Sequence, residues 1–111
     1  MAFFRKKNEY ENASNQINNS NKKARERIIF EQLNNDSQQA ATLIDQLKAG
    51  SPLVIDFERL DVKEGNKMLA FFAGACYASD ARYIELRESV FLFARNVDFH
   101  DGTLDEFIKN L

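Results

Sequence analysis

The sequence predicts one α/β (α+β) domain, a compact two-layer sandwich with the element order β-α-β-α-β-β and a short C-terminal helix. Two observations support this fold. Apolar residues change between strand-type and helix-type spacing along residues 27–111, and turns rich in Gly, Pro or Asn separate these stretches. The chain has 111 residues, of which 44% are apolar, and this is enough for one core but not for a second domain.

The region before the domain has a different composition. Asn, Ser and Gln surround a single aliphatic residue, Ile17, between residues 8 and 23. Such a segment buries too little apolar surface to offset the entropy of ordering it, so residues 8–26 are expected to form a disordered linker. Residues 1–7 precede the linker as a separate basic and aromatic segment.

The first strand is expected over residues 27–33, where β-branched and aromatic residues gather. Asp36 or Ser37 then caps a helix by accepting hydrogen bonds from its free N–H groups. The apolar face of that helix follows helical spacing and consists of Ala40, Leu43, Ile44 and Leu47. Gly50 ends the helix in a left-handed conformation, and Pro52 prevents its continuation.

The second strand is predicted over residues 52–57 and should lie at the centre of the sheet, because consecutive aliphatic residues indicate that both faces are covered. The helix that follows, roughly residues 62–78, is apolar on more than one side. Such a helix needs cover on two sides, so we expect a second subunit to supply one of them and the protein to be a dimer. Gly65 and Gly74 would permit close approach along this helix.

Residues 82–86 and 90–94 are expected to pair as a hairpin with its turn at 87–89. Phe91 and Phe93 share one face of the second strand, and we expect Phe93 to pack in the core and Phe91 to line an apolar groove for a peptide. The last helix, within residues 101–111, has an apolar face formed by Leu104, Phe107, Ile108 and Leu111. Three further aromatic residues are expected to be ordinary packing residues: Tyr77, Tyr83 and Phe99.

The net charge of −2 conceals a difference between two parts of the chain. Residues 1–27 hold seven of the 15 Lys and Arg residues but three of the 17 Asp and Glu residues, which leaves eight against fourteen for residues 28–111. Binding to nucleic-acid phosphates requires clustered cations. The acidic domain therefore predicts no nucleic-acid partner.

Few residues suggest catalytic chemistry. One cysteine, Cys76, and one histidine, His100, do not supply the spacing of a zinc site, and Cys76 lies in the most apolar helix, as expected of an inert thiol. Asp56, Glu58 and Asp61 cluster after a strand, where acid–base or metal chemistry is conceivable, but a solvated loop is the commoner arrangement. We expect no enzyme, metal or cofactor, and a small hydrolase or nuclease using these carboxylates is the least favoured alternative.

The domain resembles the SepF family of bacterial cell-division proteins. The resemblance runs from about residue 27 to residue 111 and rests on three blocks at matching spacing: PLVIDFERL at 52–60, FFAGACYA at 71–78 and VFLFARNVD at 90–98. It implies an adaptor without known catalysis that dimerises, assembles into higher polymers and receives the C-terminal tail of FtsZ, the bacterial tubulin homologue. It also implies a cytoplasmic protein, peripheral on the inner face of the membrane at the division site.

The resemblance also assigns residues for FtsZ binding. Gly65 matches a small residue of the second helix that contributes to FtsZ binding, and Phe91 matches the strand phenylalanine of the tail-binding pocket. Glu85 stands where many relatives have Lys, so a charge contact to the FtsZ tail is expected to be absent or moved to Arg82 or Arg87.

For self-association, the resemblance implies that Gly74 packs closely against another subunit. Phe71 and Phe72 beside it complete the expected dimer or polymer interface.

The first seven residues are interpreted as a membrane anchor. Phe3 and Phe4 would enter the headgroup boundary, while the cations of Arg5, Lys6 and Lys7 meet anionic lipid at about 1 kcal/mol each. A basic terminus without a membrane role is the alternative for this segment. For the whole chain, the alternative to the adaptor is a small-molecule-sensing regulatory α/β dimer.

Overall fold

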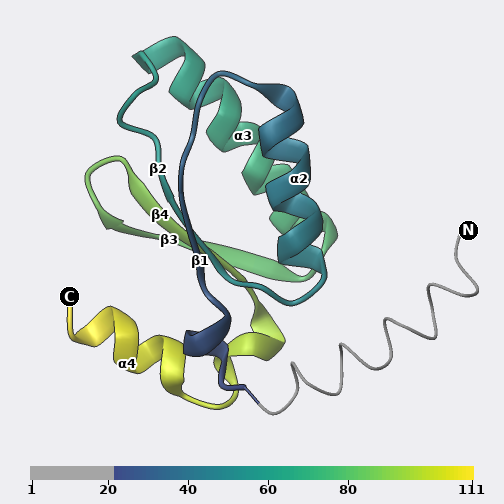
Figure 1. Ribbon diagram of the computed structural model, residues 1–111, viewed down its shortest axis with the longest axis vertical. Helices are drawn as coiled ribbons and strands as arrows, with labels where there is room; N and C mark the ends of the chain where they lie inside the picture. Colours follow the sequence, from purple (N-terminus) through teal and green to yellow (C-terminus); the bar gives the residue numbers. More distant parts are fainter. Residues whose placement is uncertain (1–21) are drawn as a thin grey trace, which may run out of the picture.

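The computed structural model describes residues 22–111, and it confirms the predicted order of strands and helices (Figure 1). In chain order the elements are η1 (Ala24–Arg27), β1 (Ile29–Gln32), α2 (Ser37–Lys48), β2 (Leu53–Asp56), α3 (Val62–Ala78), β3 (Ala81–Arg87), β4 (Val90–Arg95), η2 (Asn96–Phe99) and α4 (Thr103–Lys109). The segment at residues 1–7 and most of the predicted linker lie outside the described residues.

The four strands form one mixed sheet in the order β1-β2-β4-β3. β1 and β2 run parallel through the crossover helix α2, whereas β4 is antiparallel to both β2 and β3. The strand predicted to be central, β2, therefore has neighbours on both sides. Figure 1 shows α2 and α3 together on one face of this sheet and α4 away from them, beside η1.

The larger core lies between the sheet and the helices α2 and α3. Successive residues of a strand point to opposite faces, so Leu53 and Ile55 of β2 enter this core while Val54 faces the other way. Phe72 of α3 is fully buried here, with its ring centroid 5.0 Å from that of Phe93 and 6.1 Å from that of Phe57. Phe93 is thus the core residue that its position in the strand predicted.

A second, smaller core lies on the opposite face of the sheet. Leu92 of β4 and Leu104 of α4 are both fully buried in it, and Phe99, predicted to be a packing residue, joins them. The last helix ends at Lys109, two residues earlier than the predicted bound, and Leu111 lies exposed beyond it. α4 thus partly covers the face of the sheet that lies opposite α2 and α3, a face that is exposed to solvent in a sandwich of only two layers.

The first helix and its ends follow their sequence signals. The carboxylate of Asp36 caps α2 by accepting hydrogen bonds from the backbone N–H groups of Gln38 at 2.9 Å and Gln39 at 3.4 Å. Gly50 follows the helix with a φ of 110°, a conformation that favours glycine. A Cβ atom at Gly50 would also lie 2.9 Å from Nη2 of Arg95, so a larger residue there would displace the end of that side chain.

The domain begins earlier than predicted. Ala24 and Arg27 belong to the short helix η1 rather than to the linker and the first strand, because Ala24 is fully buried in the second core. The Nε atom of Arg27 donates to the carbonyl oxygen of Gly50 at 2.9 Å, and its Nη2 atom lies 2.6 Å from Oδ1 of Asp98. Contacts between residues more than twenty positions apart leave no local pattern in the sequence. The predicted linker therefore included residues 24–26, which belong to the domain.

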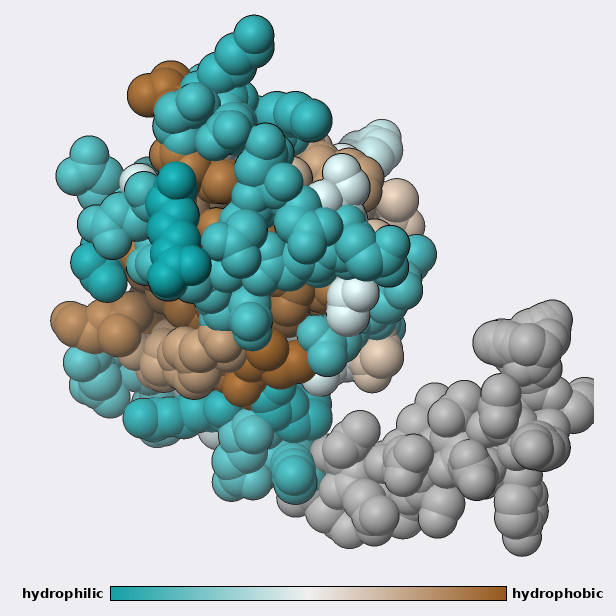
Figure 2. Space-filling view, turned by 45° about the horizontal axis from the view of Figure 1, so that its top comes forward, coloured by the Kyte–Doolittle hydropathy of each residue, from teal (hydrophilic) through white to brown (hydrophobic). Residues whose placement is uncertain are grey.

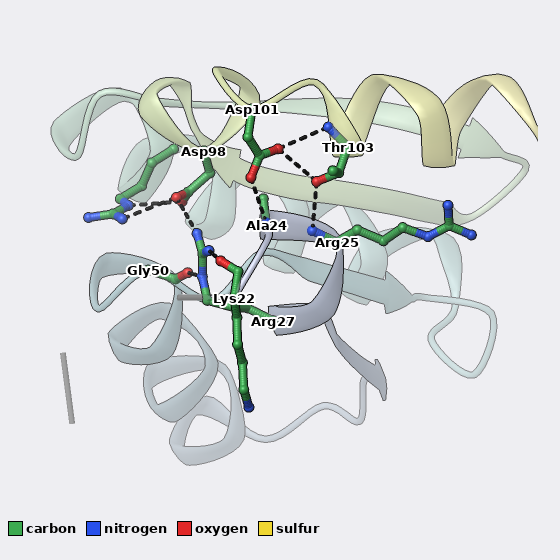
Figure 3. A network of polar contacts seen from close by, with 9 residues as sticks. Lys22, Ala24, Arg25, Arg27, Gly50, Asp98, Asp101 and Thr103 are labelled. Carbon is green, nitrogen blue, oxygen red and sulfur yellow. Dashed lines mark hydrogen bonds and ion pairs between the residues drawn. The ribbon is translucent and has the colours of Figure 1, made fainter. Parts of the chain in front are cut away.

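These contacts form a network that fastens the start of the domain to the segment after β4 (Figure 3). Asp98, a buried carboxylate, also pairs with Arg95, whose Nε atom lies 3.0 Å from Oδ2. Asp101 accepts from the backbone N–H of Ala24 at 2.9 Å and from that of Thr103 at 2.9 Å. We call Arg27, Arg95, Asp98 and Asp101 the clamp.

Candidate functional site

A cleft of about 250 Å³ lies between the start of α3, the residues after β2 and the β3–β4 hairpin. Gly65, Glu85 and Phe91 all line it, although they come from three different elements. The structure therefore brings together the three residues that the sequence analysis associated with tail binding.

The floor of the cleft is apolar. Phe91 is half-buried and packs its ring 5.4 Å, centroid to centroid, from Phe57 and 6.2 Å from Tyr83. The other apolar lining residues are Leu60, Val62 and Leu69. The partial exposure of Phe91 contrasts with the complete burial of Phe93 on the same face of β4. One aromatic residue of this strand thus remains accessible at the cleft.

One wall of the cleft is set by the way α3 begins. Asp61 and Glu64 form a capping box, in which Oδ1 of Asp61 accepts from the N–H of Glu64 at 2.8 Å and Oε1 of Glu64 accepts from the N–H of Asp61 at 3.2 Å. The cap fixes the first turn of the helix and so places Gly65 on the cleft side. A Cβ atom at Gly65 would meet only Cβ of Leu60, at 3.9 Å, so the fold itself does not require glycine there.

The opposite wall is the β3–β4 hairpin. Ser89 adopts a φ of 66° in its turn, and its carbonyl oxygen accepts from the N–H of Phe57 at 2.7 Å, which ties the turn to the end of β2. The pairing of the two strands is irregular between Glu85 and Arg87, as at a β-bulge. Glu85 and Glu88 consequently stand at the rim of the cleft.

Of the two alternatives for the charge contact, absence or transfer to Arg82 or Arg87, the structure favours absence, because neither arginine lines the cleft. The guanidinium group of Arg82 lies 3.9 Å from the centroid of the Phe99 ring, close to the clamp. Arg87 lines a separate hollow together with Phe30 and Val90. Alternation along β3 places Arg82 on the face opposite to Glu85. The irregular pairing between Glu85 and Arg87 brings Arg87 opposite Val90, a residue of the second core, and so away from the cleft.

Much of the surface of α3 faces away from the cores. Phe71 is 49% exposed and Tyr77 is 93% exposed, so the expectation that Tyr77 is a packing residue of its own chain is wrong. Gly74 lies on the same exposed side, and a Cβ atom there would meet no atom within 4 Å. We call Phe71, Gly74 and Tyr77 the outer face of α3.

Phe72 does not belong to this face, because its side chain is fully buried in the larger core. Adjacent positions of a helix point about 100° apart, which places Phe71 and Phe72 on different sides. A hollow of about 450 Å³ lies beside Phe71 and is also lined by Lys67 and Ala70. Apolar side chains gather in a band between hydrophilic ridges on the side of the domain seen in Figure 2.

Two of the three carboxylates at the end of β2 and after it, those of Asp56 and Asp61, are used in local structure. Asp56 accepts from the N–H of Glu58 at 2.8 Å, and Asp61 is the helix cap already described. Within residues 22–111 no group of three His, Cys, Asp or Glu side chains is placed to hold a metal ion. Burial raises the pKa of the Cys76 thiol to about 11, so little of the reactive thiolate exists near neutral pH.

The described helices are also too short or too polar to serve as membrane spans: none in residues 22–111 has the length and apolar content to cross a bilayer. The chain thus presents a small α/β sheet domain with an apolar cleft, an acidic rim and an exposed helix face. Such an arrangement is typical of small binding domains.

Comparison with known proteins identifies the domain. The sequence matches the family described as "Cell division protein SepF" over residues 35–98, which is more than half of the chain. The chain belongs to the SepF family of cell-division proteins.

Three relatives called "Cell division protein SepF" illustrate the match. The protein of Carboxydothermus hydrogenoformans is 31% identical over 80 residues, which are 72% of this chain and 57% of the relative. Those of Alkaliphilus oremlandii and Alkaliphilus metalliredigens are 30% and 31% identical over 84 residues, which are 75% of this chain and 56% and 55% of the relatives. The chain therefore spans about half the length of the curated relatives it matches.

Sequence reasoning missed part of this cleft. Glu88 was assigned only to a turn, and Leu60 and Leu69 had no site role, yet all three line the cleft. The D-x-x-E pattern at residues 61–64 is a signal that could have located the first turn of α3 and hence this wall. The hairpin itself was predicted, but its position beside the start of α3 depends on the pairing of β4 with β2, which are far apart in the chain and give no local signal of their pairing.

Proposed function

We propose that this chain is a division adaptor that binds the C-terminal tail of FtsZ in its cleft and tethers FtsZ to the cytoplasmic membrane during septum assembly. The observation that supports the proposal is the convergence of Gly65, Glu85 and Phe91 on one cleft. A short tail would place an apolar side chain on the floor formed by Phe91 and Phe57. The cleft is smaller than the roughly 300–1,000 Å³ typical of small-molecule sites, which favours a peptide side chain over a metabolite.

Self-association is the second part of the proposal. The outer face of α3 exposes two aromatic rings beside a position, Gly74, that offers no steric obstacle to a neighbouring helix. A second copy packing on this face would cover Phe71 and Tyr77, and the hollow beside Phe71 has room for a side chain of that copy. The pair would present two clefts and two N-terminal segments.

Membrane attachment is the third part and concerns residues 1–7. One short anchor with Phe3, Phe4 and three cations holds lipid weakly, but multivalency in a dimer or polymer raises avidity by about 10²–10⁴. We expect the chain to sediment with liposomes that contain anionic lipid, and a chain that lacks residues 1–7 to stay in the supernatant. Sedimentation of both chains alike would refute the anchor.

Two leucine substitutions on α3 separate tail binding from self-association. Gly65→Leu fills the cleft, so it should weaken binding of an FtsZ C-terminal peptide by at least about tenfold, or 1.4 kcal/mol, in a calorimetric titration. Gly74→Leu is the matched control, because it makes the same chemical change in the same helix but away from the cleft. It should leave the affinity for the peptide unchanged while shifting sedimentation toward the single chain.

Circular dichroism must show both variants folded, which is expected because neither glycine has close neighbours in the described structure. If Gly65→Leu binds the peptide as tightly as the wild-type chain does, the cleft is not the tail site. If Gly74→Leu remains fully associated, the outer face of α3 is not the contact between copies.

A further inference from the structure

The rim of the cleft carries charge of one sign. Asp61, Glu85 and Glu88 line the cleft, and none of its lining residues is Lys or Arg. The domain around it is acidic too, since residues 28–111 hold eight Lys and Arg against fourteen Asp and Glu. Clefts lined by one sign of charge concentrate ligands of the opposite sign.

Two of these three carboxylates have no partner in the described part of the chain. The carboxylate of Asp61 is engaged as the cap of α3, at 2.8 Å from the N–H of Glu64. For Glu85 and Glu88 the described residues supply neither an ion pair nor a side-chain hydrogen bond. These two groups are available to a ligand, whereas Asp98 at the far end of β4 already contacts two arginines.

The available charge lies next to the apolar floor. Glu85 and Phe91 are Cα partners in the pairing of β3 with β4. Directly opposite residues of an antiparallel pair have Cβ atoms about 4.5–5.5 Å apart, and their side chains stand on the same face of the sheet. A ligand whose apolar side chain rests on Phe91 therefore brings its next residues to Glu85, and Glu88 follows in the turn.

We propose that the cleft selects a basic tail, namely a peptide segment that carries a Lys or Arg within one or two residues of an apolar anchor. Phe91 and Phe57 receive the anchor, and Glu85 and Glu88 receive the cation. This inference rests on the proposed capture of a tail in the cleft and adds the charge of the segment that is captured. A tail with Asp or Glu at the same place meets like charge and is rejected.

The test uses calorimetry with three synthetic versions of the C-terminal tail of FtsZ from the same organism. One is the natural sequence, in one every Lys and Arg is replaced by Gln, and in one every Asp and Glu is replaced by Gln. For the wild-type chain, loss of the peptide cations should weaken binding about three- to tenfold at low salt, while loss of its acidic residues should not weaken it. The difference should nearly vanish in 1 M salt, where the Debye length is about 3 Å.

On the protein side, the double variant Glu85→Gln with Glu88→Gln should bind all three peptides alike. The double variant Asp105→Asn with Glu106→Gln is the matched control, because it changes net charge equally but on α4, away from the cleft. The control should keep the preference of the wild-type chain for the basic peptide.

The outcomes separate this inference from the proposed function. Tail binding that Gly65→Leu abolishes but that is equal for the three peptides overturns the inference and leaves the tail site intact. A wild-type chain that binds no version of the tail contradicts the proposed function and the inference together.

Two other occupants of the cleft would also overturn the inference. If a peptide of residues 1–7 displaces the tail peptides and the chain shows no preference among them, the cleft belongs to the chain's own N-terminal segment. Sedimentation that shifts to single chains in the Glu85/Glu88 variant, with unchanged tail affinity, would assign the cleft to a second copy and overturn it equally.

Discussion

The carboxylates near the two ends of β4 differ in whether they are paired with cations. At the Arg95 end, Asp98 is buried and in contact with Arg27 and Arg95, so each charge of this group has a partner. At the Val90 end, Glu85 and Glu88 stand at an open cleft and pair with no residue between 22 and 111. The Arg95 end of β4, which we call the closed end, thus carries paired charges, whereas the Val90 end carries exposed ones that are unpaired within the described residues.

The difference separates residues that stabilise the fold from residues that are free to bind. A buried charge must be paired to be tolerated, so the clamp is satisfied within the chain. Charges that stay unpaired beside accessible apolar surface cost little because they remain in water, and they are the groups that a partner can engage. Changes at the Arg95 end should affect stability alone, and changes at the Val90 end should affect binding.

The largest expected effect is a loss of stability when the ion pairs at the closed end are removed. Asp98→Ala leaves the guanidinium groups of Arg27 and Arg95 without their counter-charge in a partly buried site, and this should lower the free energy of unfolding by about 3 kcal/mol. Urea denaturation measures the loss. Asp45→Ala, an exposed position on α2, is the control and should change stability by less than about 0.5 kcal/mol. At temperatures where the variant is folded, its affinity for the FtsZ tail should equal that of the wild-type chain, and a weaker affinity would contradict the separation of the two ends.

A smaller effect sharpens the distinction between folding and binding within α3. Gly74→Ala should stabilise the single chain by about 1 kcal/mol, because alanine favours the helix and its Cβ atom meets nothing within 4 Å. The same methyl group should weaken self-association if a second copy packs closely on the outer face. Thermal unfolding of the dilute chain and analytical ultracentrifugation measure the two effects. Greater stability with unchanged association would show that this face is not an interface.

The smallest effect concerns pH at the closed end. Hydrogen bonds from the backbone N–H groups of Ala24 and Thr103 and from the Thr103 hydroxyl lower the pKa of Asp101 to about 2, from an ordinary value near 3.8. Because the folded pKa is the lower one, this stabilisation is complete above about pH 4 and is lost as the pH falls toward 2. Asp101→Asn should therefore flatten the decline of the thermal midpoint between pH 4 and pH 2. An identical decline in both proteins would show that these hydrogen bonds do not persist in solution.

The sequence predicted most of the fold because its strongest signals are local. The cap at Asp36, the stop at Gly50 and the helical spacing of Leu43, Ile44 and Leu47 each act within one or two turns, and α2 has the predicted bounds to within a residue or two. The central position of β2 followed from its consecutive aliphatic residues. The split between Phe91 and Phe93 also agreed with burial, although both were read from a single strand.

What the sequence could not predict depends on distant contacts. The clamp joins Arg27 to Asp98, 71 positions later in the chain, and so the domain begins before the predicted first strand. Phe72 was expected at an interface and Tyr77 in the interior, but Phe72 is buried and Tyr77 is exposed. In a helix with apolar residues on several sides, the sequence does not show which side faces the sheet. The acidic rim likewise depends on how the hairpin with Glu88 meets the start of α3.

The most direct test of the account is a map of tail binding by NMR. Backbone amide signals of the labelled chain are followed while the FtsZ C-terminal peptide is added. We predict shifts at Gly65, Glu85 and Phe91 and their neighbours, with no change at Arg27, Asp98 or Asp101. Shifts that gather on the clamp or on the outer face of α3, with the cleft signals unmoved, would contradict the assignment of the cleft as the tail site.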